Sequence, residues 1–372
     1  MKSLLLIIST IFLFTACMNK EIAIKKPENT QNVKVSNAKE SISYEYIKSE
    51  EVVEEKKLDL FVDNGGDFRV AIVFPSKVVG KYGNSTINSV IGYLLFKNSK
   101  FEIESFDSED ESIENIISTF EELKNKGYNK VIALFTKNSL STINNISQIS
   151  GMQVYFPLLE KSDSVYESSP NFIYGSISYL NQMEELLKLS EDNNAQFYEE
   201  SNIGYKLKAI YESLVQDIVV NQNIKIMNNN FKDIVTNERL KHTNLMINTP
   251  IVKSSIILSQ LYAYEVENGA ILSTQLNYNP LLISLTQYED RLNLILANSI
   301  EDTDDILTET LILLDTDVKY NWVNYSSLVG INYIFSRNSD NLIKNQIIDS
   351  QVIYNSNLFF STENSFKKLE LN

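Results

Sequence analysis

The sequence predicts an α/β protein with two Rossmann-like lobes, each built on a parallel β-sheet. The first observation is a continuous apolar run at 68–75, which follows Gly65 and Gly66 and ends at a proline. Such a run is typical of a strand buried on both faces. The second observation is that strands alternate with helical patterns, which favours parallel pairing. The third is that this alternation resumes after residue 172, which indicates two sheets rather than one very wide sheet.

Apolar residues at helical spacing separate the short strands of the first block. We expect strands at 68–75, 101–107, 131–135 and 153–158, and helices at 87–95, 113–123 and 140–150. Segment 101–107 alternates polar and apolar residues, as a half-buried strand does. Gly127 follows the second helix, where a glycine commonly ends one.

The second block has the same organisation and a similar length. We expect helices at 180–187, 207–218 and 253–267, and short strands at 195–199, 223–228 and 244–248. No short-period repeat is present, and no membrane-spanning segment follows the N-terminal apolar run. The sequence therefore predicts one large two-lobed unit after its N-terminal region.

The first residues of the chain have the pattern of a secretory signal. Lys2 gives a positive start, residues 4–14 are apolar, and Ala16 precedes Cys17. Segment 13–17 resembles the lipobox of bacterial lipoproteins. The resemblance implies cleavage after residue 16 and acylation of Cys17 on its thiol and its amine, with chains such as palmitate. The alternative is an uncleaved anchor helix, but the apolar run is short for a membrane crossing.

Residues 17–64 are expected to form a flexible tether behind the lipid. This segment is rich in Lys, Glu, Asn and Ser and has no sustained apolar period. Fully extended, it would reach roughly 150 Å, and as a flexible coil it would average about 40 Å. Met18 and Asn19 follow the cysteine where an aspartate usually retains a lipoprotein in the inner membrane. The outer membrane, periplasmic side, is therefore the expected location, while a Gram-positive surface lipoprotein stays open.

Composition excludes several classes of function. The chain has 48 acidic and 33 basic residues and a net charge of -15, which lacks the basic stripe of a nucleic-acid-binding protein. With Cys17 acylated, no cysteine remains for a disulfide, a nucleophile or a metal site. His242 is the single histidine, which excludes catalytic triads and histidine-rich zinc sites. No catalytic residue, metal or cofactor is expected.

The acidic clusters at 109–111 and 304–305 leave one enzymatic alternative open. Paired carboxylates are the machinery of glycoside hydrolases. Both clusters, however, lie in polar loop-like or helix-starting stretches. We therefore expect their carboxylates to be solvated helix caps rather than a general acid and base.

Three segments resemble the type I periplasmic-binding-protein family. Residues 69–76, followed by Gly80 and Gly83, are similar to its opening strand and loop. Residues 323–333 resemble its late helical segment, with Asn332 where an aspartate is common, and 351–371 resembles its terminal hairpin. The resemblance covers 66–372. It implies the following lobes: lobe 1 of about 66–172 plus about 291–345, and lobe 2 of about 173–290 plus the hairpin 346–372.

Solute receptors of this fold bind amino acids and related metabolites at the carboxyl ends of the first-lobe strands. Their helix N-termini and hydroxyls hold the ligand carboxylate. The resemblance implies these candidate cleft residues: Ser76, Thr136, Ser139, Ser162 and Tyr174. Thr136 and Ser139 are the expected carboxylate ligands. Turn capping is the alternative role of these hydroxyl groups.

Residues 171–178, which lead into a helix with Gln182 and Glu184, resemble a crossover of the penicillin-binding-protein activator (LpoA) family. That family implies an outer-membrane lipoprotein that stimulates a class A peptidoglycan synthase. The sequence lacks the helical-repeat domain that precedes this module in the longer members.

The expected function is that of a non-enzymatic, lipid-anchored periplasmic protein. It would bind and scaffold or activate a cell-envelope complex, with a class A peptidoglycan synthase (a penicillin-binding protein) as the candidate partner, and so regulate peptidoglycan synthesis. The alternative is a substrate-binding lipoprotein that delivers amino acids or related small solutes to a transporter. A receptor needs convergent polar groups in its cleft, whereas an activator needs a functional outer surface.

Overall fold

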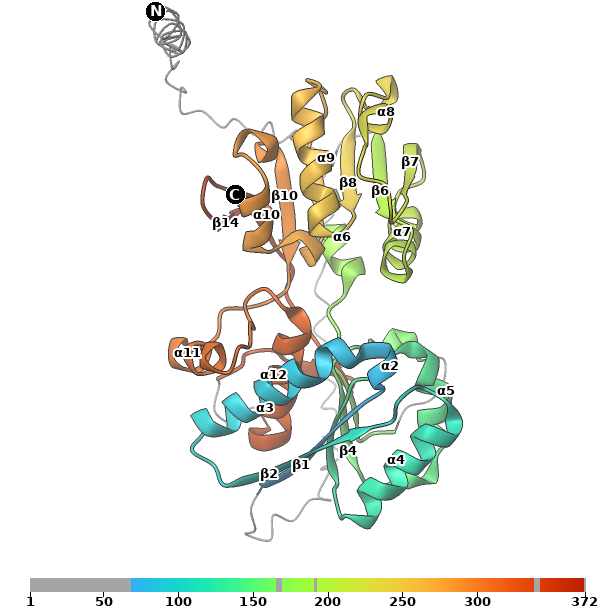
Figure 1. Cartoon of the computed structure of the whole chain (residues 1–372), viewed down its shortest axis with the longest axis vertical. Helices are drawn as coiled ribbons and strands as arrows, with labels where there is room; N and C mark the ends of the chain where they lie inside the picture. The colour runs from blue at the N-terminus through green and yellow to red at the C-terminus, as the bar shows by residue number, and fades with distance from the viewer. Residues whose placement is uncertain (1–67, 165–168, 191–192, 338–341, 371–372) are drawn as a thin grey trace, which may run out of the picture. The chain divides into compact units, whose positions relative to one another are not determined.

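A computed structural model describes residues 68–164, 169–190, 193–337 and 342–370. The described chain forms two seven-stranded sheets with helices on both faces (Figure 1). The predicted α/β fold class with two lobes is confirmed. Cys17 and the predicted tether 17–64 lie outside the described residues.

The first sheet has the strand order β11-β12-β5-β4-β3-β1-β2. Its strands are β1 (Phe68–Phe74), β2 (Phe101–Asp107), β3 (Lys130–Ala133), β4 (Gln153–Phe156), β5 (Phe172–Tyr174), β11 (Ile347–Ile348) and β12 (Gln351–Val352). The pairs from β2 to β12 are parallel, and β11 runs antiparallel to β12.

Helices cover both faces of this sheet, so alternate residues of β1 are buried in two different cores. Val70 and Ile72 pack with α3 (Gly83–Phe96) and α12 (Trp322–Ser336), whereas Ala71 and Val73 pack against α4 (Ile113–Asn125). Two short helices, α2 (Ser76–Val79) and α5 (Leu140–Ile143), follow β1 and β3.

The second sheet has the order β14-β13-β10-β9-β8-β6-β7. Its strands are β6 (Asn194–Glu199), β7 (Ile218–Ile224), β8 (Asn244–Asn248), β9 (Ile271–Ser273), β10 (Leu294–Asn298), β13 (Asn357–Ser361) and β14 (Phe366–Lys368). One face carries α6 (Tyr179–Leu187) and α7 (Asn202–Leu214). The other carries α8 (Lys232–Val235), α9 (Ile251–Ala263) and α10 (Pro280–Leu285).

The membership of three strands differs from the expected lobe boundaries. β10 lies in the second sheet although 291–345 was assigned to lobe 1, and β11 and β12 lie in the first sheet although 346–372 was assigned to lobe 2. The expected terminal hairpin is present as β13 and β14, which pair antiparallel. Short apolar segments do not specify their sheet, because that choice depends on pairing between strands far apart in sequence.

Two predicted elements also have different bounds. The helix expected at 140–150 is the four-residue α5 followed by a 3-10 turn, Ser147–Ile149. The helix expected at 207–218 ends at Leu214, and β7 begins at Ile218 rather than at 223. The β-branched run from Ile218 to Val220 fits a strand better than a helix.

The remaining long connection contains α11 (Asp305–Leu313), which packs on α3. This connection, 299–321, joins β10 of the second sheet to α12 beside the first. Within the described ranges, no helix combines the length and the hydropathy that a membrane crossing requires.

Candidate functional site

The carboxyl ends of β1, β2 and β3 meet at one edge of the first sheet because these strands are parallel. Ligands of open α/β sheets bind outside this edge. Ser76 follows β1, Thr136 follows β3, and residues 107–112, called here the acidic loop, begin at the last residue of β2. These three segments form the candidate site.

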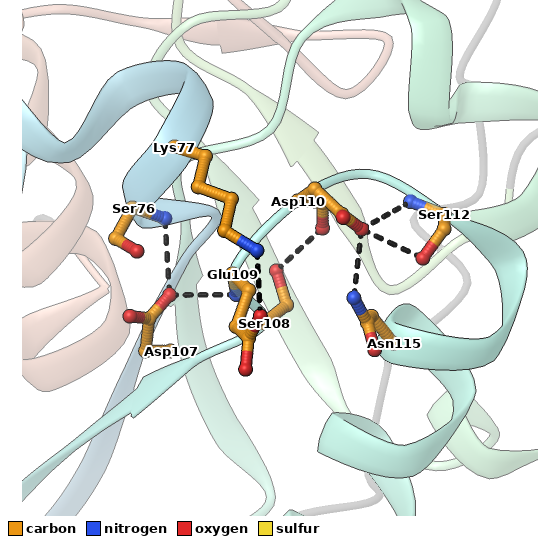
Figure 2. Close-up of polar contacts among 8 residues, drawn as sticks. All are labelled: Ser76, Lys77, Asp107, Ser108, Glu109, Asp110, Ser112 and Asn115. Atoms are coloured by element: carbon orange, nitrogen blue, oxygen red, sulfur yellow. Dashed lines mark hydrogen bonds and ion pairs between the residues drawn. The ribbon is translucent and has the colours of Figure 1, made fainter.

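The first residue of the acidic loop, Asp107, binds the N-terminus of α2. Asp107 Oδ1 accepts hydrogen bonds from the backbone N–H groups of Ser76 at 3.0 Å and Glu109 at 2.7 Å (Figure 2). Partial burial raises the pKa of Asp107, but the hydrogen bonds from Ser76 and Glu109 outweigh it and leave the pKa below its ordinary value. Lys77 Nζ lies 2.7 Å from Glu109 Oε2. The carboxylate of Asp107 therefore already accepts the first backbone N–H of α2, that of Ser76.

Asp110 binds residues at the start of α4. Its Oδ1 accepts hydrogen bonds from the Ser112 N–H at 3.0 Å, the Ser112 hydroxyl at 2.6 Å and Asn115 Nδ2 at 2.8 Å (Figure 2). These hydrogen bonds, led by that of the Ser112 hydroxyl, lower the pKa of Asp110 to about 2. Asp304 is the N-cap residue of α11, where its Oδ1 accepts the amides of Ile306 and Leu307. Asp304 is therefore the helix cap that its sequence context predicts, whereas Asp110 binds the residue that precedes the first turn of α4.

Glu111 binds both polar groups of Thr136. The Thr136 N–H donates to Glu111 Oε1 at 2.5 Å, and the Thr136 hydroxyl donates to Glu111 Oε2 at 2.6 Å. Thr136 is one of the two residues, with Ser139, that were expected to bind the carboxylate of a solute. In this structure the carboxylate comes from the chain itself, 25 residues earlier in the sequence.

The other candidate residues have different surroundings. The Ser139 hydroxyl is buried and donates to the Thr136 carbonyl at 2.8 Å, so it closes the turn after β3. The Ser76 side chain is exposed at the same edge. Tyr174 is fully buried in the core, where its ring stacks on Phe156 with centroids 5.7 Å apart. Ser76, Thr136 and Ser139 therefore belong to one edge of the sheet, and the Tyr174 ring belongs to the core.

Ser162 lines a separate hollow of about 190 Å³. Its walls are Glu160, Lys161, Ser162, Ser176, Ser178, Asn181, Gln351, Val352, Ile353 and Tyr354. The hollow is smaller than the roughly 300–1,000 Å³ of typical small-molecule pockets. Burial raises the pKa of Glu160, although the ammonium group of Lys206, 3.3 Å away, opposes this shift. No local pattern indicated Gln351, which reaches the hollow through the pairing of β12 with β5.

A buried ion pair lies at the carboxyl edge of the second sheet. Lys253 Nζ is 3.0 Å from Glu199 Oε1, and both side chains are at most 12% exposed. The same ammonium group donates to the Lys225 carbonyl at 2.7 Å. Lys253 thereby ties the first turn of α9 to the ends of β6 and β7. No sequence pattern indicates this pair, because a lysine near a helix start normally faces solvent.

The described part of the chain contains neither a cluster of metal-ligating side chains nor a buried histidine. No group of three or more acidic, histidine or cysteine side chains there is arranged to hold a metal ion. The His242 side chain is 78% exposed and lies 3.9 Å from Glu267. His242 is therefore a surface residue.

Comparisons with known proteins give a fold and no sequence family. No family model matches the chain, and no curated protein sequence matches it. Among solved structures, a putative branched-chain amino acid ABC transporter protein from Rhodospirillum rubrum is 12% identical with a TM-score of 0.63, over 82% of this chain and 100% of that one. The LpoA C-domain from Haemophilus influenzae, described as a regulator of PBP1A, is 11% identical with a TM-score of 0.53, over 81% and 100%.

The chain has the type I periplasmic-binding-protein fold. The predicted resemblance to the LpoA C-domain is also confirmed. Full-length LpoA from Haemophilus influenzae is 12% identical with a TM-score of 0.56, and the match covers 82% of this chain but only 59% of that one. This fold is shared by the regulator and the transporter protein, so it does not by itself choose between the two expected functions.

Proposed function

We propose that the chain is a non-enzymatic, lipid-anchored periplasmic protein that binds and scaffolds or activates a cell-envelope complex. The observation that carries the proposal is the contact of Glu111 with Thr136, because it occupies the groups that a solute receptor offers to a ligand. The contact of Asp107 with the Ser76 amide has the same effect at α2.

An internal carboxylate is a strong competitor. A group held on the same chain acts at an effective concentration of about millimolar or more. A free amino acid would have to displace Glu111 and also leave the Glu111 carboxylate without its two donors. We therefore expect Glu111 to stay bound to Thr136, so that this position does not bind a solute reversibly.

A class A peptidoglycan synthase is the first partner to test. The LpoA C-domain is described as a regulator of PBP1A, and the match covers all of that domain. Acylation of Cys17 and a tether over 17–64 would hold the lobes in the periplasm at the outer membrane, within reach of such a partner. This assignment rests on fold similarity and on the N-terminal sequence pattern.

A solute receptor is the second candidate function. The hollow beside Ser162 has polar groups from three segments, including Asn181 and Gln351. The transporter protein from Rhodospirillum rubrum also has a higher TM-score, 0.63, than the LpoA C-domain, 0.53. A small ligand in this hollow would contact Ser162 without displacing Glu111.

Thermal unfolding against a library of amino acids, small peptides and muropeptides separates the two functions. A ligand that binds only the folded protein at about 100 times its Kd adds about 2.7 kcal/mol of stability. We expect no saturable shift of the midpoint with any compound class. A saturable shift with one class of solute would contradict the scaffold function and favour the receptor.

Glu111→Ala is expected to lower the free energy of unfolding by about 1–3 kcal/mol, because it leaves the Thr136 amide and hydroxyl without their acceptor. Acetate in the buffer should restore part of this loss by entering the vacated position, and it should not stabilise the unmodified protein. Urea unfolding with and without acetate measures both effects. The matched control is Glu114→Ala on the exposed side of α4, which should change stability by less than about 0.5 kcal/mol. Equal stabilities of the two variants would contradict this account of the site.

A further inference from the structure

The helix α11 is fixed to the first lobe along one side only. Leu307 and Leu311 are fully buried, and the Leu311 side chain fills the space left by Gly92 of α3, where a Cβ would lie 2.5 Å from Leu311 Cδ2. At the end of the helix, Asn88 Nδ2 donates to the Leu314 carbonyl at 2.9 Å. Figure 1 shows α11 beside α3, at the margin of the lower lobe.

Three large apolar side chains of α11 remain in solvent. Ile306 is 67% exposed, Ile312 is 63% exposed and Leu313 is 86% exposed. Ile306 and Leu313 are seven residues apart and therefore lie on one stripe of the helix. Isolated exposed residues need no explanation, but several on one nine-residue helix mark an interaction surface.

Acidic residues surround this apolar surface. Segment 301–317 contains seven acidic residues and no lysine or arginine. These are Glu301, Asp302, Asp304, Asp305, Glu309, Asp315 and Asp317. Asp304 caps the helix, Asp317 accepts the amides of Lys319 and Tyr320, and Glu301 accepts Asn355. The exposed carboxylates of Asp302, Asp305, Glu309 and Asp315 are not part of these contacts.

We propose that α11 is the docking surface for a segment of a protein partner that carries apolar anchors flanked by lysine or arginine. The proposal rests on the proposed function, namely that the chain acts by binding a protein. A segment of this kind covers Ile306, Ile312 and Leu313 and at the same time places positive charge against the carboxylates.

The charge pattern disfavours the other occupants. A second copy of this chain would bring two identical acidic surfaces together, and like charges across an interface oppose association. An anionic lipid surface is repelled for the same reason. Because segment 299–321 connects the second sheet to α12, a partner bound at α11 would also be attached to the connection between the lobes.

The test places a photoreactive amino acid at Leu313 in the full-length protein in its own envelope. Matched positions are Met227, which is 90% exposed, and Leu285, which is 44% exposed. We expect a covalent adduct to a protein from position 313, with an attached peptide that carries lysine or arginine beside apolar residues. The charge reversal Asp305→Lys with Glu309→Lys should lower the adduct yield by about ten-fold or more, whereas Glu265→Lys with Glu289→Lys should leave it unchanged.

The outcomes separate this surface from the proposed function. Adducts from Met227 or Leu285 but not from position 313 overturn the α11 surface and leave a protein-binding function in place. No protein adduct from any of the three positions overturns both. Three other results also overturn the α11 surface. They are an adduct between two copies of the chain, an adduct to lipid alone, and an adduct yield that the charge reversal does not change. Equal melting midpoints of the two reversal variants check that folding is retained, and Glu309→Lys alone replaces the pair if they differ.

Discussion

Arg291→Met is expected to lower the free energy of unfolding by about 3–5 kcal/mol, because it removes a buried cation whose Nη1 and Nη2 both donate hydrogen bonds. Arg291 is 1% exposed. Its Nη1 donates to the Thr286 carbonyl at 2.9 Å and the Thr286 hydroxyl at 2.6 Å, and its Nη2 donates to the Thr362 carbonyl at 3.0 Å. Methionine fills a similar volume but donates nothing, so several buried acceptors lose their partner.

The Arg291 side chain joins two parts of the second lobe. Thr286 ends α10, and Thr362 lies in the turn between β13 and β14. We therefore expect amide hydrogen exchange in 357–368 to accelerate in the variant more than exchange in the first sheet. Urea unfolding measures the total loss. Arg239→Met is the matched control because Arg239 is exposed, and a similar loss in both variants would show that the buried contacts of Arg291 contribute little.

Most of the fold could be predicted because its strands are short, apolar and bounded by turn residues. The expected strands at 101–107 and 244–248 match β2 and β8. Pairing over long distances was not predictable. The sequence does not indicate that β10 joins the second sheet or that β12 pairs with β5, because both facts depend on contacts between segments far apart.

In the candidate site, too, the positions along the chain could be predicted but the contacts between distant segments could not. Ser76 and Thr136 could be located because the carboxyl ends of parallel strands converge. Their acceptors, Asp107 and Glu111, were not foreseen, since each belongs to another strand end. Arg291 lies in the polar stretch after α10, where a sequence pattern predicts exposure. Long-range polar pairing therefore limits what a single sequence shows about this site.

Gly204→Ala is expected to lower the free energy of unfolding by about 3 kcal/mol or more, because the added methyl group meets backbone. A Cβ at Gly204 would lie 2.0 Å from the Glu199 carbonyl oxygen, so α7 would have to move away from the end of β6. This movement would strain the cap in which Ser201 Oγ accepts the Gly204 N–H at 3.2 Å. It would also disturb the buried contact of Glu199 with Lys253.

The matched variant is Gly80→Ala, where the nearest atom to an added Cβ is Ser76 Cβ at 3.6 Å. Gly80 has a φ of -52°, which alanine adopts without strain, so this change should be neutral or should stabilise by about 0.4–1 kcal/mol. Urea unfolding of both variants gives the comparison. Equal and small effects would mean that α7 moves freely on β6. A large loss at Gly204 alone would mean that the first turn of α7 is fixed at the carboxyl edge of the second sheet, where the Lys253–Glu199 pair also lies.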